Sequence, residues 1–353
     1  MPRAIFAIPG DLASLTGGYH YDREVLGRLP GLGIEIEHLA LPGGFPAPNA
    51  QELALTQHLF AAASHDAVLF IDGLAFGACP ASLVEGIAQP VVALIHHPLA
   101  LETGLDDARR AFLHACEKAA LSKAVHVIVP SPTTKAALVA DYGVPEHRIT
   151  IALPGTQPAR QAHGSGSISL AMLAVGSVVP RKGYDVLVEA LAPLRHETWT
   201  LAIAGSLDRA PAHVASLRKL VAAHDLEGRI TLTGEIDGGA LDALYAGADL
   251  FVMSSHYEGY GMVLAEAMAR GLPIVVTTGG AAGDTVPDAA ALKVAPGNSA
   301  ALGAALRQML RDAPRRARLA EASFKAGHAL PTWEDTARIV ADVLARVAEG
   351  KSA

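Results

Sequence analysis

Two glutamates, Glu258 and Glu266, stand with seven residues between them in the segment of this sequence that carries the most chemistry. Residues 254–273 read SSHYEGYGMVLAEAMARGLP, which is typical of a strand end, a glycine loop, a helix and a turn. A helix that begins near Gly261 directs unpaired N–H groups and the positive end of its dipole at a ligand, so it favours an anion. A carboxylate such as Glu266 also suits the hydroxyls of a ribose. The segment predicts a site for a phosphorylated ligand; alternatively, Glu258 caps the helix and Glu266 lies on a solvated face.

Two basic residues, Arg181 and Lys182, occupy a similar position in an earlier segment. Residues 174–191 read AVGSVVPRKGYDVLVEAL, a strand that ends in a turn and opens a helix. Cations at the start of a helix oppose its dipole unless an anion compensates for them. The pair is therefore predicted to bind an anionic group such as a diphosphate.

The first half of the chain offers two histidines and two glycines after apolar runs. His96 and His97 follow the run 91–95, and α/β folds place functional groups at the carboxyl ends of strands. Adjacent residues of an extended chain point to opposite sides, and neither an HExxH motif nor a cysteine pair accompanies them, so we expect no metal site. Gly17 and Gly18 predict a loop whose backbone approaches a ligand closely. A structural histidine and an ordinary turn are the alternatives.

Short apolar runs alternate with segments of helical pattern along the whole chain. Twelve runs predict strands buried on both faces, at residues 4–8, 34–39, 67–71, 91–95, 125–129, 149–153, 170–175, 200–204, 230–233, 250–253, 274–277 and 292–294. Residues 154–168, between the two sets, have the Gly, Pro and Ser content of a linker. We therefore expect an α/β protein of two Rossmann-like, doubly wound parallel-sheet domains, residues 1–160 and 161–330. A helix in 331–353, with Thr332 as N-cap and Trp333 as apolar anchor, is expected to pack back on the first domain.

The composition narrows the class of protein further. The 353 residues are 51% hydrophobic and carry a formal charge of -7, which argues against a general affinity for nucleic acid or anionic lipid. Only Cys79 and Cys116 are present, no signal-peptide pattern opens the sequence, and no apolar stretch approaches the roughly 20 residues that span a bilayer. A cytoplasmic protein is expected, and association with a membrane surface is left open.

The segment around the two glutamates resembles glycosyltransferase family 4, the retaining enzymes of the GT-B fold. The mark of that family is a glutamate, seven residues and a second glutamate, and Glu258 and Glu266 match it in register, together with EGYG and EAMARGLPIV. Segment 174–191 resembles the family's phosphate clamp, with Ser177 where many members have an arginine. The resemblance implies two Rossmann-like domains facing across a cleft, with the acceptor bound mainly by the first and the donor by the second.

The resemblance also implies roles for the matching residues. It makes His96, Glu258 and Lys182 the predicted catalytic residues, with His96 near the reacting sugar and His97 as its neighbour. It places Arg181 with Lys182 on the leaving diphosphate and Glu266 on the ribose. Contacts to phosphate or acceptor are predicted for Gly17, Gly18 and His97. The remaining predicted contacts to the donor are Gly259, Tyr260, Gly261, Met262 and Gly280.

The implied reaction moves a sugar from a nucleoside diphosphate donor to a hydroxyl of a sugar, lipid-linked or polysaccharide acceptor, with retention at the anomeric carbon. The leaving diphosphate assists deprotonation of the acceptor. No cofactor or metal is expected, because the chain has no Asp-x-Asp sequence. A sugar-nucleotide epimerase of the same fold class and a non-catalytic family member that binds nucleotide sugars are the alternatives. The donor base, the sugar, the acceptor and the oligomeric state are left open.

Overall fold

The computed structural model describes residues 1–350, which form two compact units. Unit 1 comprises Met1–Gly155 together with the C-terminal segment from Pro331, and unit 2 comprises Thr156–Leu330. Each unit has its own six-stranded parallel sheet with helices around it. The predicted α/β fold class with two doubly wound sheets is confirmed.

The sheet of unit 1 has the strand order β2-β1-β3-β4-β5-β6. Its strands are β1 Arg3–Pro9, β2 Glu35–Leu41, β3 Val68–Asp72, β4 Val91–Leu94, β5 His126–Val129 and β6 Ile149–Ile151. The direction of winding reverses between β1 and β3, which pair in parallel. Ligands of open parallel sheets bind beyond the carboxyl ends of the strands at such a reversal.

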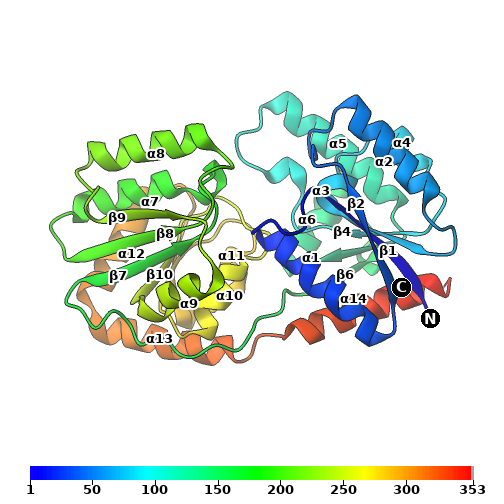
Figure 1. Cartoon of the computed structure of the whole chain (residues 1–353). Helices are drawn as coiled ribbons and strands as arrows, with labels where there is room; N and C mark the ends of the chain where they lie inside the picture. The colour runs from blue at the N-terminus through cyan, green and yellow to red at the C-terminus, as the bar shows by residue number, and fades with distance from the viewer. Residues whose placement is uncertain (351–353) are drawn as a thin grey trace. The chain divides into compact units, whose positions relative to one another are not determined.

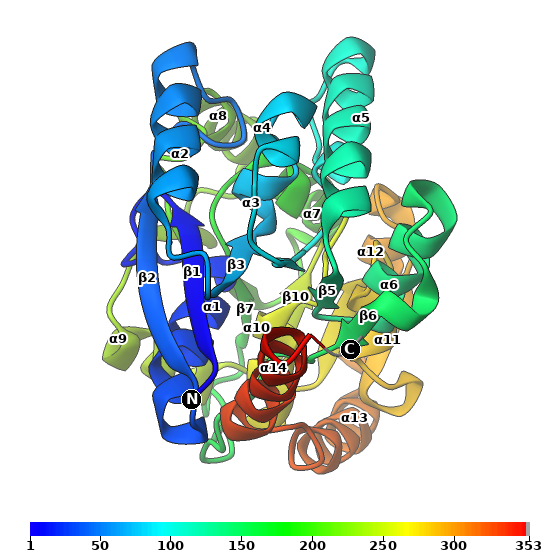
Figure 2. The same cartoon turned by 90° about the vertical axis from the view of Figure 1, so that its right-hand side faces the viewer.

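Helices cover both faces of this sheet (Figure 1, Figure 2). They are α1 Gly17–Arg28, α2 Ala50–Ala62, α3 Gly73–Phe76, α4 Ala81–Glu85, α5 Asp107–Lys123, α6 Pro132–Tyr142 and α14 Trp333–Ala348, with short 3-10 helices at Leu29–Leu32, Leu99–Leu101 and Glu146–Arg148. Residues of α2, α5 and α6 form one apolar core with β-strand residues that include Ile5 and Ala7. The helix α14 packs against α1, β3 and β5. Thr332 caps α14 and Trp333 is buried, as the sequence predicted.

The sheet of unit 2 has the strand order β12-β11-β10-β7-β8-β9. Its strands are β7 Leu170–Val175, β8 Trp199–Ala204, β9 Ile230–Gly234, β10 Leu250–Met253, β11 Ile274–Thr277 and β12 Ala291–Val294. The winding reverses between β7 and β10, which pair in parallel. The carboxyl ends of these two strands are therefore the expected place for a ligand in unit 2.

Helices cover both faces of the second sheet as well (Figure 1). They are α7 Tyr184–Leu191, α8 Pro211–Ala223, α9 Gly238–Gly247, α10 Met262–Ala269, α11 Ala282–Thr285, α12 Ser299–Arg311 and α13 Ala313–Gly327, with 3-10 helices at Pro180–Lys182, Ala192–Leu194 and Asp288–Ala290. Met172 of β7 packs in one core with α7, α8 and α12, whereas the next residue, Leu173, packs in a second core with α9 and α10. This alternation is what a strand covered on both faces requires.

The strands differ in burial between the centre and the edges of the sheets. Every residue of β3, β4, β5, β10 and β11 is buried, as predicted. The prediction is wrong for the four edge strands β2, β6, β9 and β12, where most residues are partly or fully exposed. An edge strand has a neighbour on one side only, so it keeps contact with water.

The predicted linker 154–168 contains no helix or strand, and the boundary between the units falls between Gly155 and Thr156. Part of the segment is nevertheless fixed to unit 2. The N–H of Ala162 donates to the carbonyl of Arg270 at 2.9 Å, and the N–H of Ser165 donates to Oδ1 of Asp249 at 3.0 Å. These residues are therefore part of unit 2 and not a free tether.

Candidate functional site

Arg181 and Lys182 lie in the 3-10 turn Pro180–Lys182, between β7 and α7. The next residue, Gly183, has a φ of +60°, and a Cβ at this position would come within 2.3 Å of the carbonyl oxygen of Ser254. Glycine is required because the backbone is left-handed and closely packed. Oγ of Ser254 also donates a hydrogen bond to the carbonyl of Lys182 at 2.9 Å. The loops that follow β7 and β10 are thus fixed to each other at the reversal of the sheet.

Glu258, in the loop after β10, is bound by both basic side chains. Nζ of Lys182 lies 2.7 Å from Oε1, and Nη1 of Arg181 lies 3.2 Å from Oε2. Oγ of Ser255 donates another hydrogen bond to Oε1 at 2.6 Å. Burial alone raises the pKa of Glu258, but Lys182 and Arg181 outweigh burial and lower it to about 2. We call Arg181, Lys182, Ser255 and Glu258 the Glu258 cluster.

The charges of the Glu258 cluster do not cancel. Two cations and one carboxylate leave one positive charge. The carboxylate side chain is 8% exposed, while those of Arg181 and Lys182 are 17% and 13% exposed. The sequence predicted an anion next to the two cations, and Glu258 is one such anion. The positive charge that Glu258 does not balance suits an anionic ligand.

The glycine loop leads from Glu258 into α10, as the sequence predicted. Gly261 is the N-cap residue of α10, with a φ of 90°. The first N–H groups of a helix, here those of Met262 and Val263, have no acceptor within the helix, so they are available to an anion. The N–H of Leu264 donates to the carbonyl of Gly261 at 2.8 Å. The side chain of Tyr260 is buried, so this residue, like Gly259, offers a ligand mainly its backbone.

Gly280 packs directly on the backbone of the Glu258 loop. A Cβ at Gly280 would come within 2.3 Å of the carbonyl oxygen of Glu258. The N–H of Glu258 donates to the carbonyl of Gly279 at 3.1 Å, and the N–H of Ala281 donates to the carbonyl of Glu258 at 2.8 Å. Gly280 therefore holds the loop in place, and its contact with a donor stays a prediction.

Glu266 of α10 is held by Tyr245 of α9. Oη of Tyr245 donates to Oε2 of Glu266 at 2.8 Å, and the guanidinium of Arg270 lies 4.5 Å from the centroid of the tyrosine ring. In residues 1–350, Oε1 of Glu266 has no hydrogen-bond partner, and Glu266 and Glu258 share none. One oxygen of Glu266 is thus oriented by the protein, and the other can accept a hydrogen bond from a ligand hydroxyl.

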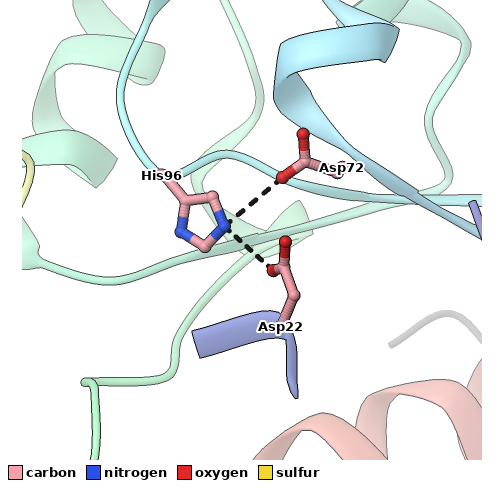
Figure 3. Close-up of side chains that lie close together, drawn as sticks. All are labelled: Asp22, Asp72 and His96. Atoms are coloured by element: carbon pink, nitrogen blue, oxygen red, sulfur yellow. Dashed lines mark hydrogen bonds and ion pairs between the residues drawn. The ribbon is translucent and has the colours of Figure 1, made fainter. Parts of the chain in front are cut away.

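In unit 1, two carboxylates surround one ring nitrogen of His96 (Figure 3). Nε2 of His96 lies 3.0 Å from Oδ1 of Asp22 and 3.3 Å from Oδ2 of Asp72. Asp22 belongs to α1, which follows β1, and Asp72 is the last residue of β3. His96 comes shortly after β4, so the three side chains meet beyond three neighbouring strands at the reversal of the sheet. We call Asp22, Asp72 and His96 the His96 cluster.

The carboxylates of the His96 cluster are buried more deeply than the imidazole. The side chains of Asp22 and Asp72 are 0% and 4% exposed, and that of His96 is 21% exposed. Burial alone lowers the pKa of His96, but the two carboxylates outweigh burial and raise it above its usual range. Burial also raises the pKa of Asp22. The cluster therefore favours a protonated imidazole.

Gly17 and Gly18 form the first turn of α1, so the prediction of a loop at these glycines is wrong. The helix begins here because Oγ1 of Thr16 accepts a hydrogen bond from the N–H of Tyr19 at 3.2 Å and so caps it. The expected close approach exists, but to His96: a Cβ at Gly18 would come within 3.3 Å of Cδ2 of the ring. His97 faces elsewhere, with Nε2 3.4 Å from Oε2 of Glu102.

Four partners of the predicted site residues were not identified from the sequence: Asp22, Asp72, Ser255 and Tyr245. Asp72 ends an apolar run, so the rule that selected His96 could also have selected it. Ser255 lies inside the segment that carries the two glutamates. Asp22 and Tyr245 lie within helices, and no local pattern distinguishes them from other helical residues.

The His96 cluster is also a group that could hold a metal ion. One ligand atom from each of its three residues lies within 4.8 Å of the others. Two carboxylate oxygens and an imidazole nitrogen suit a divalent cation such as Zn²⁺ or Mn²⁺. The sequence argument against a metal considered the direction of the adjacent histidines and the HExxH, cysteine and Asp-x-Asp patterns, so it did not test this combination of distant residues.

Among the helices of residues 1–350, none combines the length and the apolar character that a bilayer crossing needs.

Two family profiles match the sequence. Residues 156–326 match the family described as glycosyl transferases group 1, and residues 27–160 match glycosyltransferase family 4. A mannosylfructose-phosphate synthase of Agrobacterium fabrum is 32% identical over 174 residues, which are 44% of this chain and 38% of that protein. The chain spans 38% and 52% of the lengths of the first two curated relatives that it matches.

Solved structures resemble the chain over nearly its whole length. A sucrose-phosphate synthase from Thermosynechococcus elongatus has a TM-score of 0.84 at 22% identity and covers 99% of this chain and 100% of its own. HepE of Anabaena, in complex with UDP-glucose, has a TM-score of 0.77 at 17% identity and covers 97% of this chain and 99% of its own. At these identities the likeness shows the fold. Unit 1 thus matches a glycosyltransferase family 4 profile over most of its length, unit 2 matches a group 1 profile, and the chain has the GT-B fold of these solved structures.

Proposed function

We propose that this chain is a retaining, metal-independent glycosyltransferase that moves a sugar from a nucleoside diphosphate to an acceptor hydroxyl. The observation that carries the proposal is the Glu258 cluster, in which Arg181 and Lys182 lie at the sheet reversal of unit 2 with one excess positive charge. The cluster adjoins the start of α10, where the helix N–H groups attract an anion. That HepE is solved with UDP-glucose supports a nucleotide sugar as the donor of a protein with this fold.

Lys182 and Arg181 stabilise the negative charge that grows on the leaving diphosphate. Their attraction to the diphosphate strengthens as the bond to the sugar breaks, so it lowers the barrier and not only the energy of binding. Glu258 holds both cations in place before the donor arrives. Such fixed positive charge takes the part that a divalent metal plays in other glycosyl transfers.

Glu266 binds the ribose of the donor. Tyr245 fixes Oε2, which leaves Oε1 to accept a hydrogen bond from a ribose hydroxyl. The glycine loop Gly259–Met262 contributes backbone N–H groups to the diphosphate. The donor is thus held by unit 2.

Retention follows if the acceptor attacks from the face that the diphosphate leaves. The bond from the anomeric carbon to the diphosphate oxygen breaks, the bond to the acceptor oxygen forms, and the acceptor proton passes to the departing diphosphate. The family resemblance gives His96 of unit 1 a place near the reacting sugar. The acceptor class is a sugar, a lipid-linked sugar or a polysaccharide.

The test incubates the full chain with UDP-, GDP- and ADP-sugars and with free sugars, sugar phosphates and glycolipids as acceptors, and follows release of nucleoside diphosphate. NMR of the product then gives the anomeric configuration, and EDTA tests for a metal. We expect release, retention and resistance to EDTA. No release together with no binding of any nucleoside diphosphate contradicts the proposal. An inverted product contradicts retention, and interconversion of sugar nucleotides without acceptor identifies an epimerase.

A further inference from the structure

Two members of the His96 cluster, Asp22 and Asp72, have no part in the reaction proposed above. They come from different elements, yet each directs an oxygen at Nε2 of His96. We propose that Asp22 and Asp72 are positioning residues that hold His96 by its Nε2–H, so that His96 meets its substrate as an Nδ1–H donor and not as a general base. The role of His96 as a hydrogen-bond donor to the substrate rests on the proposed function, whereas the protonation of its ring nitrogens does not.

The chain contacts the His96 ring at Nε2 and along the Cδ2 edge, and no contact at Nδ1 is found among residues 1–350. Nε2 faces the two carboxylates, and the backbone of Gly18 lies against the Cδ2 edge, where an added Cβ would be 3.3 Å from Cδ2 and 3.6 Å from Nε2. The ring of Tyr21 packs edge-on with a centroid distance of 5.3 Å. Figure 3 shows Nδ1 directed away from both carboxylates. Nδ1 is therefore the nitrogen that a substrate can reach.

The carboxylates determine which nitrogen carries a proton. An ionised carboxylate only accepts hydrogen bonds, so Nε2 must be the donor to both Asp22 and Asp72. Oδ2 of Asp22 is buried and has no hydrogen-bond partner in residues 1–350. Two buried carboxylates beside a neutral ring would leave two negative charges in a medium of low dielectric. A second proton, on Nδ1, offsets one of these charges, in agreement with the raised pKa of His96.

The other groups around the cluster do not remove this need for charge. Arg23 of α1 attracts Asp22, but its guanidinium is bound to the carbonyls of Leu12 and Ser14. Tyr21, also of α1, is kept neutral because burial raises its pKa, and its hydroxyl donates to the carbonyl of Ala152 at 3.1 Å. Trp333 of α14, which packs on Tyr21, has no charge. The imidazole is thus the cation in direct contact with both carboxylates.

A doubly protonated His96 constrains the chemistry. It cannot take the proton of the acceptor hydroxyl, because both nitrogens already carry one. Its Nδ1–H instead donates to an oxygen of the substrate, either a hydroxyl or a phosphate oxygen. The acceptor proton must then leave by another route, which is the departing diphosphate of the proposed retaining reaction.

The direct test is ¹⁵N NMR of the imidazoles in the full chain labelled with ¹⁵N-histidine. The chain has 15 histidines, and His96→Gln identifies the signal of His96. We expect both nitrogens of His96 to show protonated shifts from about pH 6 to pH 8.5, a range in which an ordinary histidine, with a pKa near 6.5, loses its charge. An unprotonated Nδ1 at neutral pH overturns the inference. The protonation state is measured on the unmodified chain, and only the assignment uses His96→Gln.

Variants of the carboxylates test the positioning role. In Asp22→Asn and Asp72→Asn, we expect His96 to titrate near its ordinary pKa and kcat at about pH 8 to fall about 10- to 100-fold, the value of a hydrogen bond to a charged group. Because the charged ring is the active form, the lost activity should return as the pH falls through that pKa. The KM for the donor should not change. A pH profile identical to that of the unmodified chain overturns the inference.

Asp72 needs a matched control because it also caps α3 by accepting from the N–H of Leu74 at 2.8 Å. Asp106→Asn removes an exposed aspartate that caps α5 in the same way, through the N–H of Arg109 at 2.7 Å. This control should leave the signal of His96 and the pH profile unchanged. Asp72→Ser keeps an oxygen for the cap but is too short to reach Nε2, so it should behave like Asp72→Asn.

A metal ion is the competing occupant of the His96 cluster. Adding equimolar ZnCl₂ or MnCl₂ to the EDTA-treated chain should leave the Nε2–H signal in place. Loss of that signal with a gain of activity makes the cluster a metal site and overturns the inference.

The inference and the proposed function can fail separately. A doubly protonated His96 in a chain without transferase activity refutes the proposed function and leaves the assignment of the ring protons intact. A neutral ring in an active transferase refutes only the inference.

Discussion

The two charged clusters of this chain are built in opposite ways. In the Glu258 cluster of unit 2, one carboxylate is held by two cations. In the His96 cluster of unit 1, one imidazole is held by two carboxylates. Both lie beyond the carboxyl ends of the strands where the winding of a parallel sheet reverses.

In both clusters, nevertheless, the positively charged groups are the ones that reach the surface. In both, the carboxylates are buried more deeply than the cations or the imidazole that they contact, which are partly exposed. A buried carboxylate fixes a positive group in place at the cost of its own desolvation. The comparison teaches that both units use internal carboxylates to present positive charge outward, with two long, flexible side chains in unit 2 and one rigid ring in unit 1.

The largest effect is expected at Lys182, whose charge we propose to contact the diphosphate. Lys182→Ala removes the cation that lies 2.7 Å from Glu258 and leaves that buried carboxylate with Arg181 alone. We expect kcat to fall about 100- to 1000-fold, as for the loss of one group that stabilises an oxyanion. The measurement is release of nucleoside diphosphate. Lys219→Ala, on the exposed side of α8, is the control, and a Lys182→Ala chain with full turnover would place the diphosphate elsewhere.

The second largest effect is expected from removal of the negative charge of Glu258, which both cations of its cluster contact. Glu258→Gln leaves two partly buried cations without a carboxylate, so we expect unit 2 to lose about 3 kcal/mol at neutral pH, the lower end for breaking a buried ion pair. The pKa of Glu258 is lowered from 4.5 to about 2. The native state therefore binds this proton less readily than the unfolded state, so its contribution is complete above 4.5 and is lost as the pH falls towards 2.

The pH dependence of the contribution of Glu258 to stability can be measured because each unit contains one tryptophan. These are Trp199 in unit 2 and Trp333 in unit 1. In a Trp333→Phe background, the fluorescence of Trp199 follows the urea unfolding of unit 2. The difference in unfolding free energy between chains with and without Glu258→Gln should shrink as the pH falls from 4.5 to 2. Glu227→Gln, at an exposed position, should show no such trend. A difference that does not vary with pH would mean that Glu258 is not stabilised as an anion.

The sequence predicted the elements of both clusters better than it predicted their contacts. All twelve runs coincide with strands of the structure, because short segments rich in apolar residues and bounded by Gly, Pro or charged residues favour strands over helices. The order of the strands is set by crossovers that no local pattern encodes. The contacts of His96 with Asp22 and of Lys182 with Glu258 span 74 and 76 residues. The family resemblance assigned Lys182 and Glu258 to the same donor site but did not predict their contact, and no motif marked Asp22.

The third prediction concerns the oriented oxygen of Glu266. Tyr245→Phe removes the hydrogen bond of 2.8 Å to Oε2 without changing the shape of the buried ring. We expect the Kd of the donor to rise about 5- to 10-fold, which corresponds to about 1 kcal/mol for one hydrogen bond, with kcat unchanged. Calorimetric titration with the donor measures it. Glu266→Ala should weaken binding more, and unchanged affinity in both variants would remove Glu266 from the ribose.

The smallest effect tests how rigidly unit 1 holds the imidazole ring of His96. Two glycines of α1 form a matched pair for this test. A Cβ at Gly27 would meet nothing within 4 Å, whereas a Cβ at Gly18 would lie 3.3 Å from Cδ2 of His96. Replacing an exposed helical glycine by alanine stabilises by about 0.5 to 1 kcal/mol, so Gly27→Ala should raise the unfolding free energy of unit 1 by that amount. Gly18→Ala should gain less than half as much, because the ring must shift by a few tenths of an ångström against two carboxylates. The unfolding of unit 1 is followed by Trp333 in a Trp199→Phe background. Equal gains from both glycines would mean that His96 moves freely, which would contradict a ring clamped by Asp22 and Asp72.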